Sequence, residues 1–592
     1  MTDSAGFRRV YALRAAIPVL FAILGALYSV VTPLWEAPDE VGHWAYIDTL
    51  LRRGRLPILQ PDVQDEAHQP PLYYALAAIP ASFADLGDRT GAFRVNPDFV
   101  WAGQGGDAAN IAQHGTAETF PYRGVALGVH LARLVSVLCG AVTVGLAGRL
   151  ARTVFPLRPG LALLVPLAIA LNPMFVYLHG SVNNDALLIT LSTVCLHWLV
   201  RILEEPERVR WWTQVGVILA LGLLTKLSIA VTGALAVAVL VASAVRSRSV
   251  AVFIIGAWRM AVPIALLSGW WFIRNAYEYG DALAWGAFRE TFASVLRSQP
   301  LTWRDVVSFF SVQWRSFWGV FGWMTVVPPA AYHALYSLVS LLGLGGCGII
   351  VARRTYRLWP ERAKRGTVVL LGVLLLQEAY LLAAIFRFDA SWYQGRYLFP
   401  IIAALAFALS LGLVAMAETL RIERHLLWAG LVPVALAVAV PFAVIRPAYE
   451  IVPVSKVAAR LVPNRHNVAF GNGLRLVGHR VSVNSRTGLL SLTLYWKADT
   501  LQTKTYSVFA HAVDGDQQLI AQHDLVPGAD RGYPPQVWWV GDVVAARHEM
   551  RLDPDTSRDV AEIRVGLFDP ATGDRAPIES GGQSTHVTLL LD

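Results

Sequence analysis

The sequence is poor in charge and in cysteine. Of its 592 residues only 16% are Asp, Glu, Lys or Arg and 55% are hydrophobic, whereas soluble domains carry about 25% charged residues. This composition excludes an ordinary soluble enzyme and a disordered chain. The three cysteines, Cys139, Cys195 and Cys347, each lie in an apolar run, so neither a disulfide framework nor a zinc cluster is expected. Internal repeats and low-complexity tracts are also lacking.

Long apolar runs are what the sequence has instead of charge. About 20 apolar residues cross the ~30 Å hydrocarbon core of a bilayer as a helix, and the 20 tryptophans are typical of membrane interfaces. We therefore predict a polytopic α-helical membrane protein with about eleven transmembrane helices. The qualifying runs are 15–34, 124–148, 160–178, 186–203, 211–225, 227–245, 253–273, 333–352, 367–386, 397–416 and 426–445. No small-residue cleavage site follows the first run, which is expected to be a retained anchor.

The positive residues of the short loops predict the orientation of the chain. They gather in alternate loops, which are expected to face the cytoplasm: 8–14, 149–158, 201–210, 246–248, 353–365 and 421–424. The net charge of +8 is then a topology signal, and no nucleic-acid partner is expected. The prediction is a multi-pass protein of the plasma (inner) membrane, with a cytoplasmic N-terminus and an extracytoplasmic C-terminal domain.

Two long loops are expected outside the membrane. The first, 35–122, holds twelve acidic residues against five arginines. Within it Asp39–Arg53 is predicted to be a helix whose apolar stripe lies among the lipid headgroups. The stripe is formed by Trp44, Ile47 and Leu51. The second loop, 274–332, alternates aromatic with charged residues and is expected to lie along the interface.

The composition changes after Arg446. Apolar and polar residues alternate in short runs that turn-forming residues separate, which predicts an extracytoplasmic β-sandwich over 453–592, beside a transmembrane domain over 1–445. The alternating runs are 490–496, 506–513, 543–552 and 563–568.

Acidic residues directly after the first run are candidates for chemistry, because ionisable groups at the edge of a membrane are costly. The segment is Asp39-Glu40-Val41-Gly42-His43. On a helix Asp39 and His43 share a face, and two adjacent carboxylates can supply a general base and an orienting or metal-binding group. The alternative is helix capping, since acids favour a helix N-terminus. The spacing is not that of a zinc protease site.

Cations at the outer ends of several spans run against the positive-inside trend. They are Lys226, Arg274 and Arg396. Each either contacts an anionic ligand or binds lipid headgroups. Asp185, in Asn183-Asn184-Asp185, is either a site residue or part of a helix cap. Acids in a long loop beside cations at the mouths of spans suit a lipid-phosphate donor, because cations can stabilise a departing phosphate.

At these residues the chain resembles the GT-C class of membrane glycosyltransferases, which take sugars from polyprenyl phosphates, and within it the protein O-mannosyltransferases and lipid A aminoarabinose transferases. The resemblance covers about residues 10–445. Its most specific parts are Pro38-Asp39-Glu40-Val41-Gly42-His43 and Gln69-Pro70-Pro71-Leu72-Tyr73-Tyr74, supported by Asn184-Asp185, Leu224-Thr225-Lys226 and Arg396-Tyr397. The C-terminal β-domain departs from the aminoarabinose transferases. Three aromatic residues near one of its expected loops either stack on sugar rings or pack the core of the sandwich: Tyr533, Trp538 and Trp539.

The resemblance implies a role for each candidate residue. Asp39 is the catalytic base, and Glu40 positions the acceptor or the base. Lys226 and Arg396 contact the donor phosphate, as Arg274 does by a weaker match to a Trp-Trp-x-x-Arg-Asn pattern. The remaining site residues are Asp185, a second acidic group, with His43 and Tyr397.

We therefore predict a glycosyltransferase that transfers a sugar from a polyprenyl phosphate to an acceptor hydroxyl on the extracytoplasmic face, with inversion. The acceptor is a protein, a lipid or a glycan. Metal dependence stays open: Mg²⁺ or Mn²⁺ could bind Asp39, Glu40 and Asp185, with His43 nearby. The alternatives are a transporter or flippase of lipid-linked sugars or polysaccharide, and a non-catalytic glycan-binding scaffold of the cell envelope.

Overall fold

The chain folds into two compact units. Unit 1 consists of Met1–Leu86 and Leu127–Ala448, and unit 2 of Gly87–Ala126 and Tyr449–Asp592. Residues 87–122, expected from the sequence to belong with the membrane domain, thus fold with the C-terminal segment. The computed structural model describes residues 4–590 apart from 61–64, 89–90, 97–98, 100–109, 113, 115–117, 423–430, 450–452, 455–461, 485–487, 501, 503, 505, 529–534, 536–537, 539, 553–559 and 580–583.

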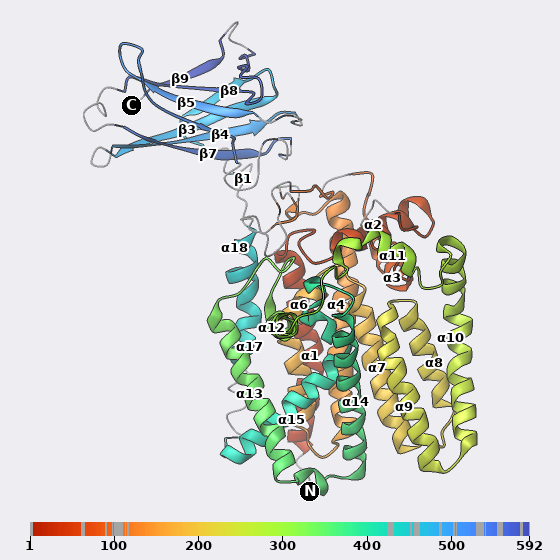
Figure 1. Ribbon diagram of the computed structural model, residues 1–592. Coiled ribbons are helices and arrows are strands. Elements are labelled where there is room, and N and C mark those ends of the chain that lie inside the picture. Colours follow the sequence, from red (N-terminus) through yellow and green to blue (C-terminus); the bar gives the residue numbers. More distant parts are fainter. Residues whose placement is uncertain are drawn as a thin grey trace. The chain divides into compact units, whose positions relative to one another are not determined.

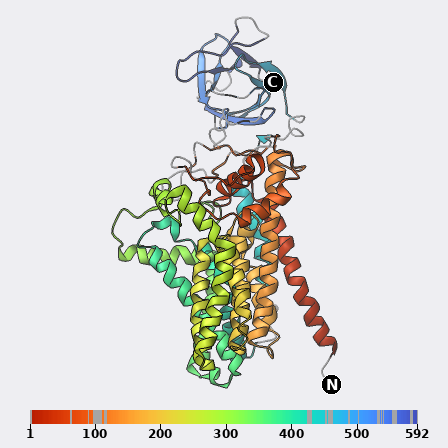
Figure 2. The same ribbon diagram turned by 90° about the vertical axis from the view of Figure 1, so that its right-hand side faces the viewer.

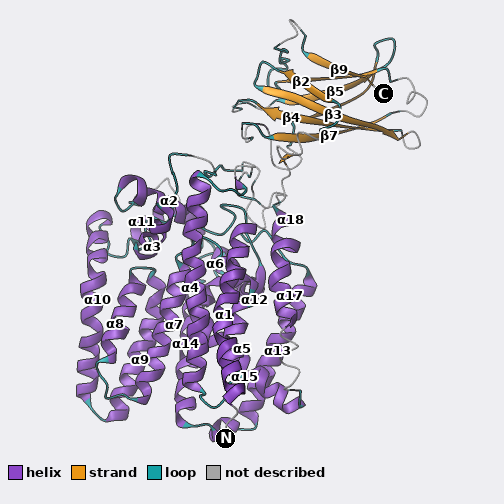
Figure 3. Cartoon of the chain, turned by 180° about the vertical axis from the view of Figure 1, so that it is seen from behind, coloured by secondary structure: helices purple, strands orange, loops and turns teal. Residues whose placement is uncertain are grey.

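Unit 1 is a bundle of long helices that run side by side (Figures 1 and 3). Eight helical segments of the described chain are long and apolar enough to cross a membrane, which confirms the polytopic membrane protein. They belong to α4 (Gly124–Val154), α7 (Asp185–Glu204), α9 (Ala230–Ser247), α10 (Val250–Tyr279), α13 (Ala330–Ala352), α14 (Glu361–Ala384), α15 (Ile402–Leu420) and α17 (Leu431–Val440).

The other three predicted spans are helical but do not meet the same criterion singly. Helices α5 (Leu161–Ala170) and α6 (Pro173–His179) meet it only as a pair that is bent by 63°, which is the geometry of a broken span or of a re-entrant loop. Helices α1 (Ser4–Val31) and α8 (Trp211–Leu223) have apolar stretches of fewer than 18 residues. Eleven spans therefore stay a prediction.

The bend between α5 and α6 has a local cause. Pro173 cannot donate a backbone hydrogen bond to α5, but it suits the first position of a new helix. Asn172 caps that helix, because its side chain accepts a hydrogen bond of 3.0 Å from the backbone N–H of Phe175. The bend redirects the chain toward Asn183 and Asp185.

Short helices gather at the end of unit 1 opposite the N-terminus (Figures 1 and 2). They are α2 (Glu40–Arg53), α3 (Leu72–Ala81) and α11 (Trp285–Thr291). Helix α12 (Trp303–Gly319) is seen nearly end-on in Figure 1, so it lies across the direction of the long helices.

The predicted helix after the first span is confirmed as α2, but the expected surroundings of its stripe are wrong. Trp44 and Ile47 are buried inside the protein. The ring of Trp44 lies against Gly128 of α4, and α3 packs on α2 itself. The stripe faces protein because neighbouring segments cover it. The periodicity of one helix shows that it has an apolar face, but not whether lipid or protein covers that face.

Helices α13 and α15 approach each other through glycines, as small residues allow in membrane helices. A Cβ on Gly346 would collide with the backbone oxygen of Gly412, whereas a Cβ on Gly348 would meet open space.

Gly346→Ala is therefore expected to lower the free energy of unfolding by about 1–3 kcal/mol, the usual cost of overpacking. Gly348→Ala, on the same helix, is the matched control and should be neutral. Thermal unfolding of the two purified proteins in one detergent measures the difference. Equal stability would mean that α13 and α15 are not in close contact.

Unit 2 contains two antiparallel sheets, in the orders β1-β7-β4-β3-β2 and β6-β5-β8-β9, drawn in orange in Figure 3. Apolar side chains from both sheets share one core, which confirms the β-domain predicted from alternating residues. The strands are β1 (Pro453–Val454), β2 (Arg465–Ala469), β3 (Leu474–Asn484), β4 (Leu489–Ala498), β5 (Ser507–Val513), β6 (Leu519–Leu525), β7 (Val543–Arg551), β8 (Glu562–Phe568) and β9 (His586–Leu590).

Of the three aromatic residues considered for sugar stacking, Trp538 is fully buried in this core. Its packing is structural. Tyr533 and Trp539 lie outside the described residues.

Candidate active site

Asp39 stands at the start of α2 in a left-handed conformation, with φ 65° and ψ 0°. Its side chain makes no capping hydrogen bond, so the capping alternative is not what the structure shows. Instead its Oδ2 lies 2.7 Å from Nη2 of Arg396, and 29% of the Asp39 side chain stays exposed. An acid in a rarely populated backbone conformation is thus paired with a cation and still open to a ligand.

Arg396 lies in the short helix η6 (Gly395–Ile401), which precedes α15. Its side chain is only 5% exposed, yet its Nε and Nη1 have no hydrogen-bond partner among the described residues. The guanidinium lies 5.2 Å from the ring centre of Tyr397. A buried arginine that uses one of its three nitrogens leaves two donors for an anion.

Gly395 fixes the position of this arginine. Its backbone N–H donates a hydrogen bond of 2.7 Å to the hydroxyl of Ser316 on α12. A Cβ at this position would collide with the backbone of Gln313 and Phe317. Only glycine lets η6 approach α12 so closely.

A second ion pair joins the turn after α8 to the start of α7. Nζ of Lys226 lies 2.6 Å from Oδ1 of Asp185. The Lys226 turn is held to α3, because the backbone N–H of Leu72 donates to the carbonyl of Leu224. Lys226, Asp185, Asp39 and Arg396 all act electrostatically on the ring of His43. The structure thus brings together five of the residues predicted for the site, and Tyr397 adjoins them.

The pKa values reflect this crowding. Burial acts to raise the pKa of Asp39, but Arg396, with His43 and Lys226, holds it below its usual value. Burial lowers the pKa of His43 to about 3, with a smaller opposing effect of Asp39, so this imidazole is neutral at pH 7. Its Nδ1 lies 2.9 Å from the hydroxyl of Tyr74.

Glu40 is in a different environment from Asp39. Its side chain is fully buried and forms two hydrogen bonds, of 2.8 and 2.6 Å, with Arg133 on α4. The backbone N–H groups of Trp35 and Val182 donate to the same carboxylate. Arg133 also binds the carbonyls at the end of α1, those of Ser29, Thr32 and Pro33. The geometry gives no support for contact between Glu40 and an acceptor. It does support a positioning role, because Glu40 precedes Val41 in the helix that Asp39 begins and binds the backbone of Val182, close to Asp185.

Arg274, predicted to contact the donor phosphate, donates to the carbonyl of Pro57 and stacks on Trp271, and it belongs to neither of the two ion pairs. Metal binding was left open by the sequence. Within the described chain no three His, Cys, Asp or Glu side chains are grouped to hold a metal ion. The carboxylates considered for a metal, Asp39, Glu40 and Asp185, are each bound to a cation instead.

Three further polar residues near the ion pairs were not predicted individually from the sequence: Glu66, Gln69 and Asn184. Asn184 donates a hydrogen bond of 3.3 Å to the side-chain oxygen of Gln69. Glu66 interacts electrostatically with Asp39. Their sequence signal was their position: Glu66 and Gln69 precede Pro70-Pro71, and Asn184 precedes Asp185.

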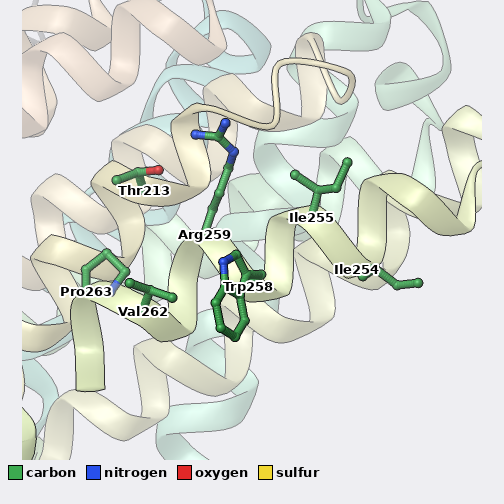
Figure 4. A pocket seen from close by; sticks show the side chains of 7 residues that line it. All are labelled: Thr213, Ile254, Ile255, Trp258, Arg259, Val262 and Pro263. Carbon is green, nitrogen blue, oxygen red and sulfur yellow. The ribbon is translucent and has the colours of Figure 1, made fainter. Parts of the chain in front are cut away.

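A separate pocket of about 470 Å³ opens on α8 and α10 (Figure 4). None of the predicted site residues lines it. The lining residues are Thr213, Ile254, Ile255, Trp258, Arg259, Val262 and Pro263.

Comparison with known proteins bears on this site. Residues 128–272 match the family model of dolichyl-phosphate-mannose-protein mannosyltransferase. The match confirms the predicted resemblance over a segment that includes Asp185 and Lys226 but not Asp39 or Arg396. No curated protein matches the chain.

Two crystal structures of ArnT from Cupriavidus metallidurans, one bound to undecaprenyl phosphate and one in the apo state, are similar to the chain. Both give a TM-score of 0.44 and 15% identity, covering 74% of this chain and 64% of ArnT. A likeness this distant assigns no activity.

Proposed function

We propose that the chain is a membrane glycosyltransferase that transfers a sugar from a polyprenyl phosphate to an acceptor hydroxyl. The observation that carries the proposal is the buried Arg396, which is bound to the accessible carboxylate of Asp39 while two of its nitrogens have no partner among the described residues. An anion-binding group thus adjoins a proton acceptor. The matching family description names a donor of this class, a polyprenyl phosphate sugar.

In the proposed reaction the donor phosphate binds Arg396 and Lys226. Asp39 takes the proton of the acceptor hydroxyl, whose oxygen attacks C1 of the sugar from the face opposite the phosphate, with inversion. The C1–O bond breaks, and the departing phosphate keeps its electron pair. Because the two cations stabilise that charge, no general acid is required. Asp185 holds Lys226 in place.

We assign the reaction to the extracytoplasmic face. Support comes from the arrangement of the chain: α2 and α3 lie at the end of unit 1 opposite the N-terminus, which the positive-inside rule expects in the cytoplasm. Lipid-linked substrates would reach the site from the outer leaflet of the plasma membrane.

The test is transfer of radiolabelled sugar from a panel of synthetic polyprenyl phosphate sugars to membranes that contain the chain. Membranes with Asp39→Asn protein are the control. Label that appears only with the wild type would support the reaction, and its product would name the acceptor. If no donor in a broad panel gives label that depends on Asp39, the proposal fails. Sugar crossing the membrane without transfer would favour the flippase.

Arg396→Lys is expected to weaken donor binding about 10- to 100-fold, because lysine cannot present two fixed donors to one phosphate. The measurement is the KM for the donor, with undecaprenyl phosphate as the competing probe. Arg274→Lys serves as the comparison and should change KM less than about threefold, since Arg274 donates to the backbone carbonyl of Pro57 and belongs to neither ion pair. If Arg274→Lys raised the donor KM more than Arg396→Lys does, Arg274 rather than Arg396 would be the phosphate-binding residue.

A further inference from the structure

Glu66 differs from the other carboxylates around the candidate site in its partners. Asp39, Asp185 and Glu40 each form an ion pair with an arginine or a lysine. Glu66 has no such pair in the described part of the chain. Among the described residues, the ionisable group nearest to its carboxylate is the imidazole of His68, whose Nε2 lies 4.0 Å from Oε2 of Glu66, and the Glu66 side chain is 15% exposed. It is an acid that nothing neutralises by direct contact.

The fold holds Glu66 against the first turn of α2. Its backbone N and Cγ lie so close to Gly42 that a Cβ there would have to displace them. The backbone N–H of Gln69 donates a hydrogen bond of 2.9 Å to the carbonyl oxygen of Glu66, and the side-chain oxygen of Gln69 accepts one from Asn184. Asn184 in turn lies 3.4 Å from Nζ of Lys226. Glu66 is therefore tied both to the helix that Asp39 begins and to the lysine of the second ion pair.

The surroundings of Glu66 place its pKa near neutral pH, so that its carboxyl group can gain and lose a proton there. Burial raises the pKa of Glu66 to about 7, and the negative charge of Asp39 adds to this, while Lys226 and Arg396 oppose it. The neighbouring His68 does not titrate there, because burial lowers its pKa to about 4. The pKa of Glu66, about 7, is close to the optimum for general acid–base catalysis at pH 7.

From this placement we propose that Glu66 is a second proton-transfer residue of the site, which takes from Asp39 the proton that the acceptor hydroxyl loses. The inference rests on the proposed function. As the acceptor oxygen bonds to C1, the C1–O bond to phosphate breaks and the electron pair leaves with the phosphate. The proton passes to Asp39, then to Glu66, then to solvent. Asp39 thereby returns to the charged form that pairs with Arg396.

The test compares the wild-type chain with Glu66→Gln in sugar transfer at saturating donor, from about pH 5.5 to about pH 8.5. In the wild type the rate should rise with pH and level off above about 7, because Glu66 must be deprotonated to take the proton. Glu66→Gln should lose that rise and, at the plateau, about 10- to 100-fold of the rate, with an unchanged KM for the donor. Glu66→Asp should recover part of both.

Asp65→Asn is the matched control, since this neighbouring acid accepts a hydrogen bond from the backbone of Ala67 and should leave the profile unchanged. A Glu66→Gln protein that keeps the wild-type profile and rate overturns the inference and leaves the proposed function intact. If the wild type transfers no sugar from any donor, both are overturned. A raised donor KM without a change in the pH profile would make Glu66 a binding residue and contradict the inference.

Discussion

Asp39→Asn is expected to lower the rate of sugar transfer about 10²- to 10⁴-fold, the usual contribution of a positioned general base. Asparagine keeps the shape of the side chain but cannot accept the proton. Donor affinity should stay the same or rise, because Arg396 loses the carboxylate at 2.7 Å that competes with the phosphate. Single-turnover transfer at saturating donor measures the chemical step separately from binding.

Asp48→Asn provides the control on the same helix. Asp48 pairs with Arg52 on the surface of α2, at 2.7 Å, and such exposed pairs contribute about 0–1 kcal/mol. Its replacement should leave both transfer and folding unchanged. Near-normal turnover by Asp39→Asn would remove Asp39 from the mechanism, whereas loss of both proteins from the membrane would show only that α2 had been disturbed.

Arg133→Met is expected to lower the free energy of unfolding by about 3–5 kcal/mol, because it leaves the charge of Glu40 buried and unpaired. Both side chains of this pair are fully buried. The double variant Glu40→Leu with Arg133→Met removes both charges and should recover the part of the loss that the unpaired charge causes. The backbone groups that the two side chains bind stay unpaired in it. Thermal unfolding in detergent, read from tryptophan fluorescence, gives the order of the three proteins.

The matched control is Arg158→Met, which breaks the pair with Glu418, where 40% and 48% of the two side chains are exposed. This change should alter the free energy of unfolding by no more than about 1 kcal/mol. If Arg133→Met is as stable as Arg158→Met, the buried pair does not hold the end of α1 to α2. A double variant less stable than the single one would also contradict the argument.

Features set by local physics were predictable from the sequence. A membrane requires each spanning helix to be apolar along its length, so the runs were visible one by one. The alternation in Leu489–Ala498 shows the two faces of a strand in the same way. The candidates at Asp39, Lys226 and Arg396 were found because charges at the membrane edge are unusual there.

Pairings between distant segments were not predictable. Asp39 and Arg396 are separated by most of unit 1, and no pattern in either segment names the other as its partner. The same holds for Glu40 and Arg133. Their buried ion pair occupies the carboxylate of Glu40, so that this acid can position Asp39 but has no free oxygen directed at a ligand. Glu66 was overlooked because its importance comes from its neighbours in space, not from its spacing in the chain.

Unit 2 is assembled from two parts of the chain that lie more than three hundred residues apart, Gly87–Ala126 and Tyr449–Asp592. The ring of His114, in the first part, contacts that of Tyr449 in the second. A truncation before Tyr449 would therefore not remove a self-contained appendage. It would also remove the residues that Gly87–Ala126 packs against. That segment belongs to the long loop that follows the first span. The β-sandwich must be probed by point substitutions on its surface, because a shortened protein that fails to work would leave its role undecided.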